Sequence, residues 1–94
     1  MKKVFKLTDS KRAPARQVDY VKHEIKKYIA RERRKTLPER VDYWDFDCVI
    51  GADEKSTNKI HVDDINKNID ALVAKDAESF YIEVLIKEGY RNKK

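Results

Sequence analysis

The sequence predicts an α+β fold, a two-layer ferredoxin-like βαββαβ sandwich in which two helices cover one face of an antiparallel sheet. Two kinds of pattern carry this prediction. Four stretches alternate apolar and polar residues, which is typical of half-buried strands, and two longer stretches show an apolar stripe at helical spacing. Elements with a single apolar face bury it by packing in two layers. The 94 residues form one domain, residues 1–94, with a single modest core.

The first half of the chain predicts a strand and a long helix. In residues 2–7, Phe5 and Leu7 point to one side of the strand and Val4 to the other. Residues 15–35 are helical, and Pro14 lies near the helix start, where its missing N–H costs nothing. The buried stripe of this helix is Val18, Val21, Ile25, Tyr28 and Ile29. Pro38 ends the helix, because the residue before a proline avoids helical geometry.

The second half predicts three strands and a helix. In residues 41–50, one face holds Trp44, Phe46, Cys48 and Ile50, and the other holds Tyr43, Asp45, Asp47 and Val49. Residues 59–62 form a short strand with His61 outward; if it does not pair, a three-stranded sheet with two helices remains. Asp63 or Asp64 caps a helix to about residue 75, with Ile65, Ile69, Leu72 and Val73 buried. Residues 79–87 form the last strand, and the tail from about residue 90 to 94 is expected to fray.

Positive charge is concentrated in the first helix. Residues 1–35 carry 13 Lys and Arg against 4 Asp and Glu, whereas residues 36–94 carry 9 against 13. Residues 22–35 alone hold seven basic and two acidic residues, which equals the net charge of +5 of the whole chain. A basic patch on one element suits a polyanion or an acidic protein surface.

The sequence also predicts a compartment. A lone cysteine, Cys48, excludes an internal disulfide and fits a reducing cytosol. No apolar run approaches the ~20 residues that span a bilayer, and no signal-peptide pattern follows the first lysines. We therefore expect a cytoplasmic protein with no membrane partner, either a monomer or a weak homodimer.

One long segment carries a family resemblance. Residues 31–51 read RERRKTLPERVDYWDFDCVIG, and they are followed by IHV at 60–62 and FYIEVLIKEGYR at 80–91. This pattern resembles a family of small bacterial proteins of unknown function that are about as long as this chain. The resemblance covers nearly the whole chain, and its WDFDC segment is the most specific part. It implies a bacterial origin and a single compact domain, and it implies no activity, cofactor or site.

The basic helix is the leading candidate for a binding surface. Its candidate anion-binding residues are Lys26, Lys27, Arg31, Arg33, Arg34 and Lys35. Lys and Arg spaced along a rigid element contact phosphates and give a salt-dependent affinity that is independent of sequence. The alternative interpretation is a solvated helix face that keeps a small domain soluble. His23 belongs to the same polar side of the helix.

The open face of the sheet is a second candidate. One imidazole and two carboxylates, His61 with Asp45 and Asp47, suit a divalent metal or an acid–base pair if the strands bring them together. The alternative is a polar network across the strands. In a ferredoxin-like sheet the two central strands would offer Val4, Lys6 and His61, which lack the aromatic pairs of RNA-recognition sheets. We therefore expect nucleic acid on the helix.

Three kinds of function remain open. The first is a small binding module whose basic helix contacts nucleic acid, with RNA slightly preferred, or an acidic protein. The second is the metal-dependent or hydrolytic site, and the third is a structural or assembly role without a ligand. Cys48 and Trp44 are expected in the core, with a partner for the indole N–H. The sequence has no Gly-rich phosphate loop, zinc spacing, serine elbow or HExxH pattern, so we expect no cofactor, and an enzyme is disfavoured.

Overall fold

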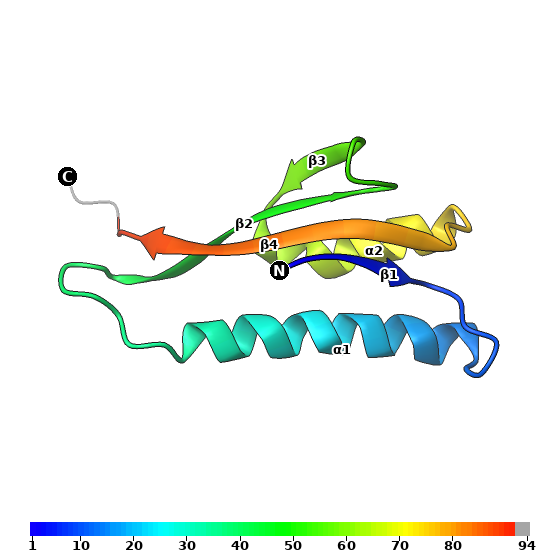
Figure 1. Cartoon of the computed structure of the whole chain (residues 1–94), viewed down its shortest axis with the longest axis horizontal. Coiled ribbons are helices and arrows are strands. Elements are labelled where there is room, and N and C mark those ends of the chain that lie inside the picture. The colour runs from blue at the N-terminus through cyan, green and yellow to red at the C-terminus, as the bar shows by residue number, and fades with distance from the viewer. Residues whose placement is uncertain (92–94) are drawn as a thin grey trace.

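The computed structural model describes residues 1–91 as a four-stranded antiparallel sheet with two helices (Figure 1). The elements in chain order are β1 (Lys2–Lys6), α1 (Pro14–Arg33), β2 (Tyr43–Gly51), β3 (Thr57–Ile60), a 3₁₀ turn η1 (Val62–Asp64), α2 (Ile65–Ala74) and β4 (Ser79–Gly89). The α+β class and every predicted helix and strand are confirmed, with ends that differ by a few residues. The domain is elongated, with extents of 48 × 24 × 20 Å.

The order of the strands corrects the ferredoxin-like prediction. That arrangement would place β1 and β3 in the centre, but the observed order is β1-β4-β2-β3, with β4 and β2 in the centre. The physical reason is length. β2 and β4 pair along nine consecutive positions, from Tyr43 opposite Gly89 to Gly51 opposite Tyr81, whereas β1 and β3 span five and four residues. Short, lysine-bearing strands are well suited to sheet edges, where unpaired backbone meets water.

The third strand does form, at residues earlier than predicted. Thr57–Ile60 pairs with β2, and Cys48 lies opposite Ile60. His61 lies outside the strand, so its predicted place on the open sheet face is wrong. Its Nδ1 accepts a hydrogen bond of 3.1 Å from the amide of Asp63 and so caps η1. A capping role is typical of a polar side chain just before a helical turn.

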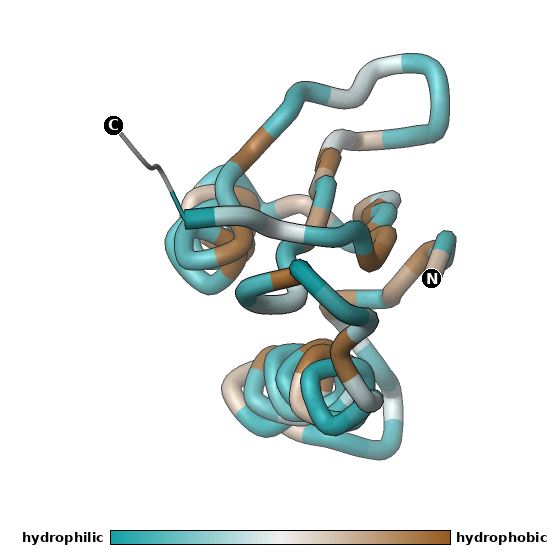
Figure 2. The backbone as a smooth tube through the Cα atoms, turned by 90° about the vertical axis from the view of Figure 1, so that its left-hand side faces the viewer, coloured by the Kyte–Doolittle hydropathy of each residue, from teal (hydrophilic) through white to brown (hydrophobic). Residues whose placement is uncertain are grey.

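One apolar core joins both helices to the same face of the sheet. From the sheet it contains Phe5, Phe46, Cys48, Ile50, Phe80, Ile82 and Val84, and from the helices Val21, Ile25, Ile29, Ile65 and Ile69. From Phe46 to Ile50 in β2 and from Phe80 to Val84 in β4, every second residue belongs to this set, as the period of a strand requires. Seen along the long axis in Figure 2, α1 and α2 are separate coils beside the sheet. Val73, predicted in the buried stripe of α2, is 39% exposed instead.

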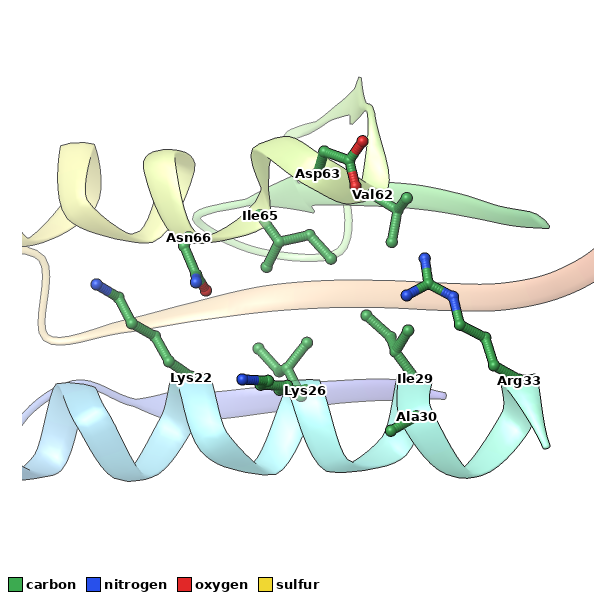
Figure 3. A pocket seen from close by; sticks show the side chains of 10 residues that line it. Lys22, Lys26, Ile29, Ala30, Arg33, Val62, Asp63, Ile65 and Asn66 are labelled. Carbon is green, nitrogen blue, oxygen red and sulfur yellow. The ribbon is translucent and has the colours of Figure 1, made fainter. Parts of the chain in front are cut away.

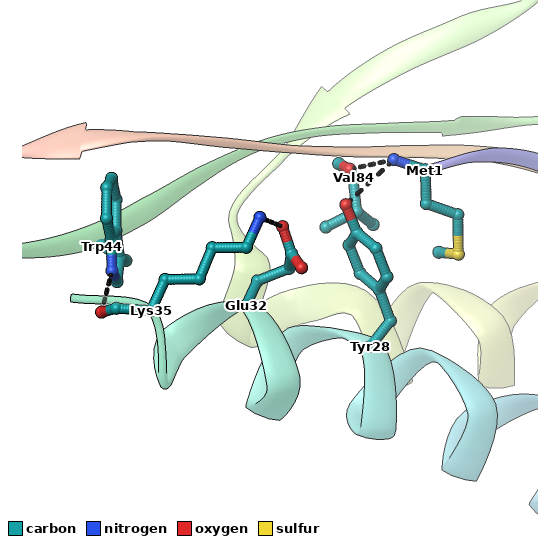
Figure 4. Close-up of polar contacts among 6 residues, drawn as sticks. All are labelled: Met1, Tyr28, Glu32, Lys35, Trp44 and Val84. Atoms are coloured by element: carbon teal, nitrogen blue, oxygen red, sulfur yellow. Dashed lines mark hydrogen bonds and ion pairs between the residues drawn. The ribbon is translucent and has the colours of Figure 1, made fainter. Parts of the chain in front are cut away.

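Trp44 also departs from its predicted role. It is half-buried and lies outside the core cluster, so the prediction that it anchors the core is wrong. The prediction that its indole N–H has a partner is confirmed, because Nε1 donates a 2.8 Å hydrogen bond to the carbonyl of Lys35, just beyond the end of α1 (Figure 4). The bond therefore connects the segment that follows α1 to β2.

The end of the chain is tied to the loop before β2. The backbone amide of Arg91 donates a 2.7 Å hydrogen bond to the carboxylate of Asp42, and the hydroxyl of Tyr90 donates to Glu88. The predicted frayed tail began at residue 90, and its last part, residues 92–94, lies outside the described residues. Among residues 1–91, no helix is both long enough and apolar enough to cross a membrane.

Candidate functional site

The exposed side of the second half of α1 is mostly positive. Of the two acidic residues in this half, Glu32 is buried and Glu24 is partly exposed. Glu32 is 8% exposed and pairs with Lys35 at 2.8 Å, and Glu24 pairs with Lys27 at 3.3 Å. The apolar stripe of α1 orients the helix, so the remaining basic side chains point to solvent. We call the exposed residues Lys26, Lys27, Arg31, Arg33, Arg34 and Lys35 the basic arc.

The structure divides these six predicted residues among three places. Lys26 and Arg33 lie on the flank of α1 that faces α2, Lys27 and Arg31 lie on the flank that faces β1, and Arg34 and Lys35 follow the helix end. Within the described residues, the side chains of Lys26, Arg31, Arg33 and Arg34 form no ion pair. They are therefore available to an external anion.

The flank of α1 that faces α2 forms a groove, which we call the basic groove (Figure 3). Its volume is about 280 Å³, and its apolar lining is Ile25, Ile29, Ala30, Val62 and Ile65. Lys22, Lys26 and Arg33 lie along the α1 rim, and Asp63 and Asn66 come from the η1–α2 side. In Figure 3 the side chain of Asn66 points into the gap between the helices, toward α1. The groove thus combines aliphatic walls, one cationic rim, one uncharged amide and the exposed carboxylate of Asp63.

The opposite flank of α1 adds a basic residue that sequence reasoning missed. Lys3 of β1 lies with Lys27, Arg31 and the acidic Glu24 around a smaller hollow of about 140 Å³. The Arg31 guanidinium lies over the ring of Tyr28 at 5.6 Å, and the Lys3 ammonium lies over Phe5 at 4.8 Å. Such contacts hold a cation near an apolar surface without neutralising it. The only sequence signal for Lys3 was its place in a strand next to the basic helix.

The end of the basic arc is held in a defined position. Trp44 of β2 bonds to the carbonyl of Lys35, and the Lys35 ammonium bonds to Glu32 (Figure 4). The Arg33 guanidinium lies 5.5 Å from the centre of the Phe46 ring. These contacts connect the last turn of α1 to β2, so the basic residues there project from a fixed base. Preorganised side chains lose less conformational entropy when they bind a ligand.

The other end of the cleft between the helices has the opposite charge. This acidic hollow, of about 640 Å³, lies between the start of α1 and the end of α2. Its charged lining is Asp19, Lys22, Asp70, Asp76 and Glu78. Lys22 lines both hollows and pairs with Asp70 of α2. This ion pair crosses the cleft and separates the basic groove from the acidic hollow.

The structure does not assemble the predicted metal ligands. Asp45, Asp47 and His61 line one shallow hollow together with Lys59 and Lys87. Among the described residues, however, no group of three His, Cys, Asp or Glu side chains has an arrangement that could hold a metal ion. Asp47 pairs with Lys87 at 2.6 Å, and this hydrogen bond raises the pKa of the Lys87 ammonium. The positive charge of Lys87 beside these carboxylates disfavours the binding of a metal ion there.

The central strands change the argument about an RNA-recognition surface. Because β2 and β4 are central, Tyr43 and Tyr81 lie on the sheet face opposite the core, and the premise that the central strands lack aromatic residues is wrong. Tyr43 is exposed there, whereas Tyr81 is buried. They do not form a stacking pair, because each lies opposite a glycine at a different end of the shared ladder, Gly89 and Gly51. The Tyr81 hydroxyl donates to Glu83, which raises the pKa of the phenol to about 12.

Cys48 is buried as predicted and is a poor nucleophile. It is 3% exposed within the core cluster. Burial, followed by the negative charges of Asp47 and Asp45, raises the pKa of the thiol to about 11. The thiolate is the reactive form of cysteine, so this side chain acts as a small apolar residue at neutral pH.

The fold and surface define a small α+β domain whose excess of positive charge is concentrated on and just after one helix. The whole chain, residues 1–94, matches one family model, and the protein belongs to this family, described as a family of unknown function (DUF6172). Comparison with curated proteins and with solved structures finds no match.

Proposed function

We propose that this protein is a small binding module whose basic arc contacts a polyanion, first of all a nucleic acid, with RNA slightly preferred, in the cytoplasm of a bacterial cell. The observation that carries the proposal is that both acidic residues in this half of α1 are paired with a lysine, Glu32 while buried and Glu24 while partly exposed. The cations of the basic arc therefore outnumber the exposed carboxylates beside them. The cytoplasmic part rests on the lone buried cysteine and the bacterial part on the sequence resemblance.

The geometry of α1 suits the charged phosphate backbone of a nucleic acid. The helix has 20 residues and is therefore about 30 Å long, with the basic arc on its second half. Its cations lie on both flanks and at the end, so they reach a backbone that crosses the helix as well as one that follows it. Contacts of this kind position a nucleic acid and do not read its sequence.

A nucleic acid fits this surface better than an acidic protein does. Protein interfaces are depleted of lysine and of charge at their centres, and they depend on buried apolar anchors. Interfaces with nucleic acid are much more positively charged. The basic arc has few acidic neighbours: Glu24 is paired with Lys27, and Asp63 lies on the opposite side of the groove. The apolar surface is confined to that groove.

Fluorescence anisotropy with labelled single-stranded RNA, single-stranded DNA and duplex DNA, at several salt concentrations, tests the proposal. Four to six phosphate contacts predict a slope of log K against log salt of roughly −3 to −4 for a single strand. In the variant K26E/R31E/R34E, which omits Lys35 to keep its pair with Glu32, the slope becomes shallower by about 2.

The matched control is K55E/K59E/K75E, which changes the net charge by the same amount at exposed sites outside α1. We expect this control to retain most of the affinity. Binding weaker than about 100 μM at low salt, or equal losses in both triple variants, would refute a site on α1. Competition with polyglutamate distinguishes a nucleic acid from an acidic protein as the ligand. If polyglutamate displaces RNA at an equal concentration of negative charge, the acidic-protein alternative is favoured.

A further inference from the structure

We propose that the basic groove holds one unpaired nucleobase, so that the domain prefers single-stranded to duplex nucleic acid and Asn66 gives it a base preference. This inference rests on the proposed function, because it names the ligand class of the same surface. It makes the groove, rather than charge alone, the source of selectivity.

The chemistry of the groove changes from one side to the other. Cations occupy the α1 rim, whereas the opposite side offers the amide of Asn66 and the carboxylate of Asp63. A strand with its phosphates on the α1 rim places its bases toward α2. The reverse orientation would bring phosphates against Asp63, which is 80% exposed at its side chain.

The walls of the groove suit the faces of a base. They are aliphatic, with Ile25 and Ile29 from α1 and Val62 and Ile65 from the facing segment. The guanidinium of Arg33 adds a planar cation at one end, supported by the Phe46 ring behind it. Unpaired bases are bound by stacking on guanidinium planes and by hydrogen bonds to their edges.

Asn66 supplies the means to read an edge. A carboxamide has one acceptor oxygen and two N–H donors, and adenine offers the complementary donor and acceptor, N6–H and N7. Asn66 is exposed, and none of the side-chain hydrogen bonds among the described residues involves its amide. The amide is therefore free for a ligand. A base that is still paired within a duplex cannot enter the groove.

The two ends of the groove limit where the strand runs. Lys26 and Arg33 are seven residues apart on α1, which is about 10 Å of rigid helix. This length corresponds to about three stacked nucleotides at roughly 3.4 Å each. Beyond Lys22 the acidic hollow repels a backbone, so the strand leaves toward the end of α1, over Arg34 and Lys35.

The experiment uses three labelled decamers of equal charge: oligoadenylate, oligouridylate and an abasic decamer without bases. Ala30→Leu fills the groove without changing charge, since Ala30 is exposed and lines it. Ala71→Leu adds the same side chain on the exposed side of α2 and serves as the control. Asn66→Ala removes the edge contact.

We expect the wild-type protein to bind oligoadenylate at least five-fold more tightly than the abasic decamer, as one good edge contact provides. Ala30→Leu abolishes this difference. The wild-type protein also binds oligoadenylate more tightly than oligouridylate, and Asn66→Ala removes this preference. The control Ala71→Leu changes neither result. Equal affinity of the wild-type protein for all three decamers overturns the nucleobase inference and leaves the polyanion function intact. Absence of binding to any decamer overturns both.

Discussion

The contact between Trp44 and the end of α1 leads to a sharp prediction about stability. Trp44→Phe keeps an aromatic ring at this position and removes the N–H that bonds to the Lys35 carbonyl at 2.8 Å. The change therefore isolates one hydrogen bond at the point where α1 meets β2. We expect a lower stability and a looser last turn of the helix.

The magnitude follows from the environment of the bond. A neutral hydrogen bond contributes about 0.5–1.5 kcal/mol to stability. Lys35 is exposed, so water replaces the lost donor at its carbonyl, and the cost lies near the middle of this range, about 1 kcal/mol. In a domain of 94 residues this lowers Tm by about 4–8 °C.

Urea unfolding followed by circular dichroism measures the effect without relying on the fluorescence of the single tryptophan. Tyr43→Phe is the neighbouring control, because the Tyr43 hydroxyl has only a long contact of 3.5 Å with the Tyr90 carbonyl. In the wild-type protein, the indole N–H resonance should also exchange slowly with solvent. An unchanged urea midpoint in Trp44→Phe, together with fast indole exchange, would refute the proposed role of this bond.

Three further predictions concern charge, pH and close packing. Lys35→Met should cost about 1 kcal/mol because it leaves the buried Glu32 without its cation, whereas Lys27→Met, which frees the more exposed Glu24, should stay within about 0.5 kcal/mol in urea unfolding. The pKa of the Cys48 thiol is about 11 in the folded protein, against an ordinary value of 9.0. Its contribution to folding stability is therefore complete below pH 9 and declines as the pH rises toward 11. Between pH 9 and 11 the free energy of unfolding should therefore fall less steeply in Cys48→Val than in the wild-type protein. The difference in slope should be up to about 1.4 kcal/mol per pH unit, and parallel curves of unfolding free energy against pH would contradict this. Gly51→Ala should lower the melting temperature far more than Gly89→Ala. The methyl group added at position 51 meets the backbone of Ser56, whereas the one added at position 89 meets the ring of Tyr43, which can rotate away. Equal melting temperatures of the two variants would contradict this prediction.

The sequence predicted the elements well because their patterns are local. The alternation around Phe46 and the stripe through Ile25 each specify an element with one apolar face, whatever its neighbours are. The strand order is not local: it depends on which strands find a partner along their full length, and β4 extends to Gly89, beyond its predicted end. With β4 and β2 in the centre, Tyr43 and Tyr81 take the central-strand positions that the prediction assigned to Val4, Lys6 and His61.

The candidate site was predicted only as a list of charges. The six residues of the basic arc follow from composition and helical spacing, and their exposure agrees with the structure. Their division between two flanks depends on where α2 and β1 pack, which no local pattern specifies. The same holds for Lys3 and Asn66, which are distant in sequence from residues 22–35 and reach this surface only through tertiary packing.

The Lys22–Asp70 ion pair divides the cleft between the helices into ends of opposite charge. Under the proposed function, a polyanion that approaches the cleft is attracted at its basic end and repelled at its acidic end, so this contrast favours an approach over the end of α1. Added salt shortens the range of this preference to about 8 Å at physiological ionic strength.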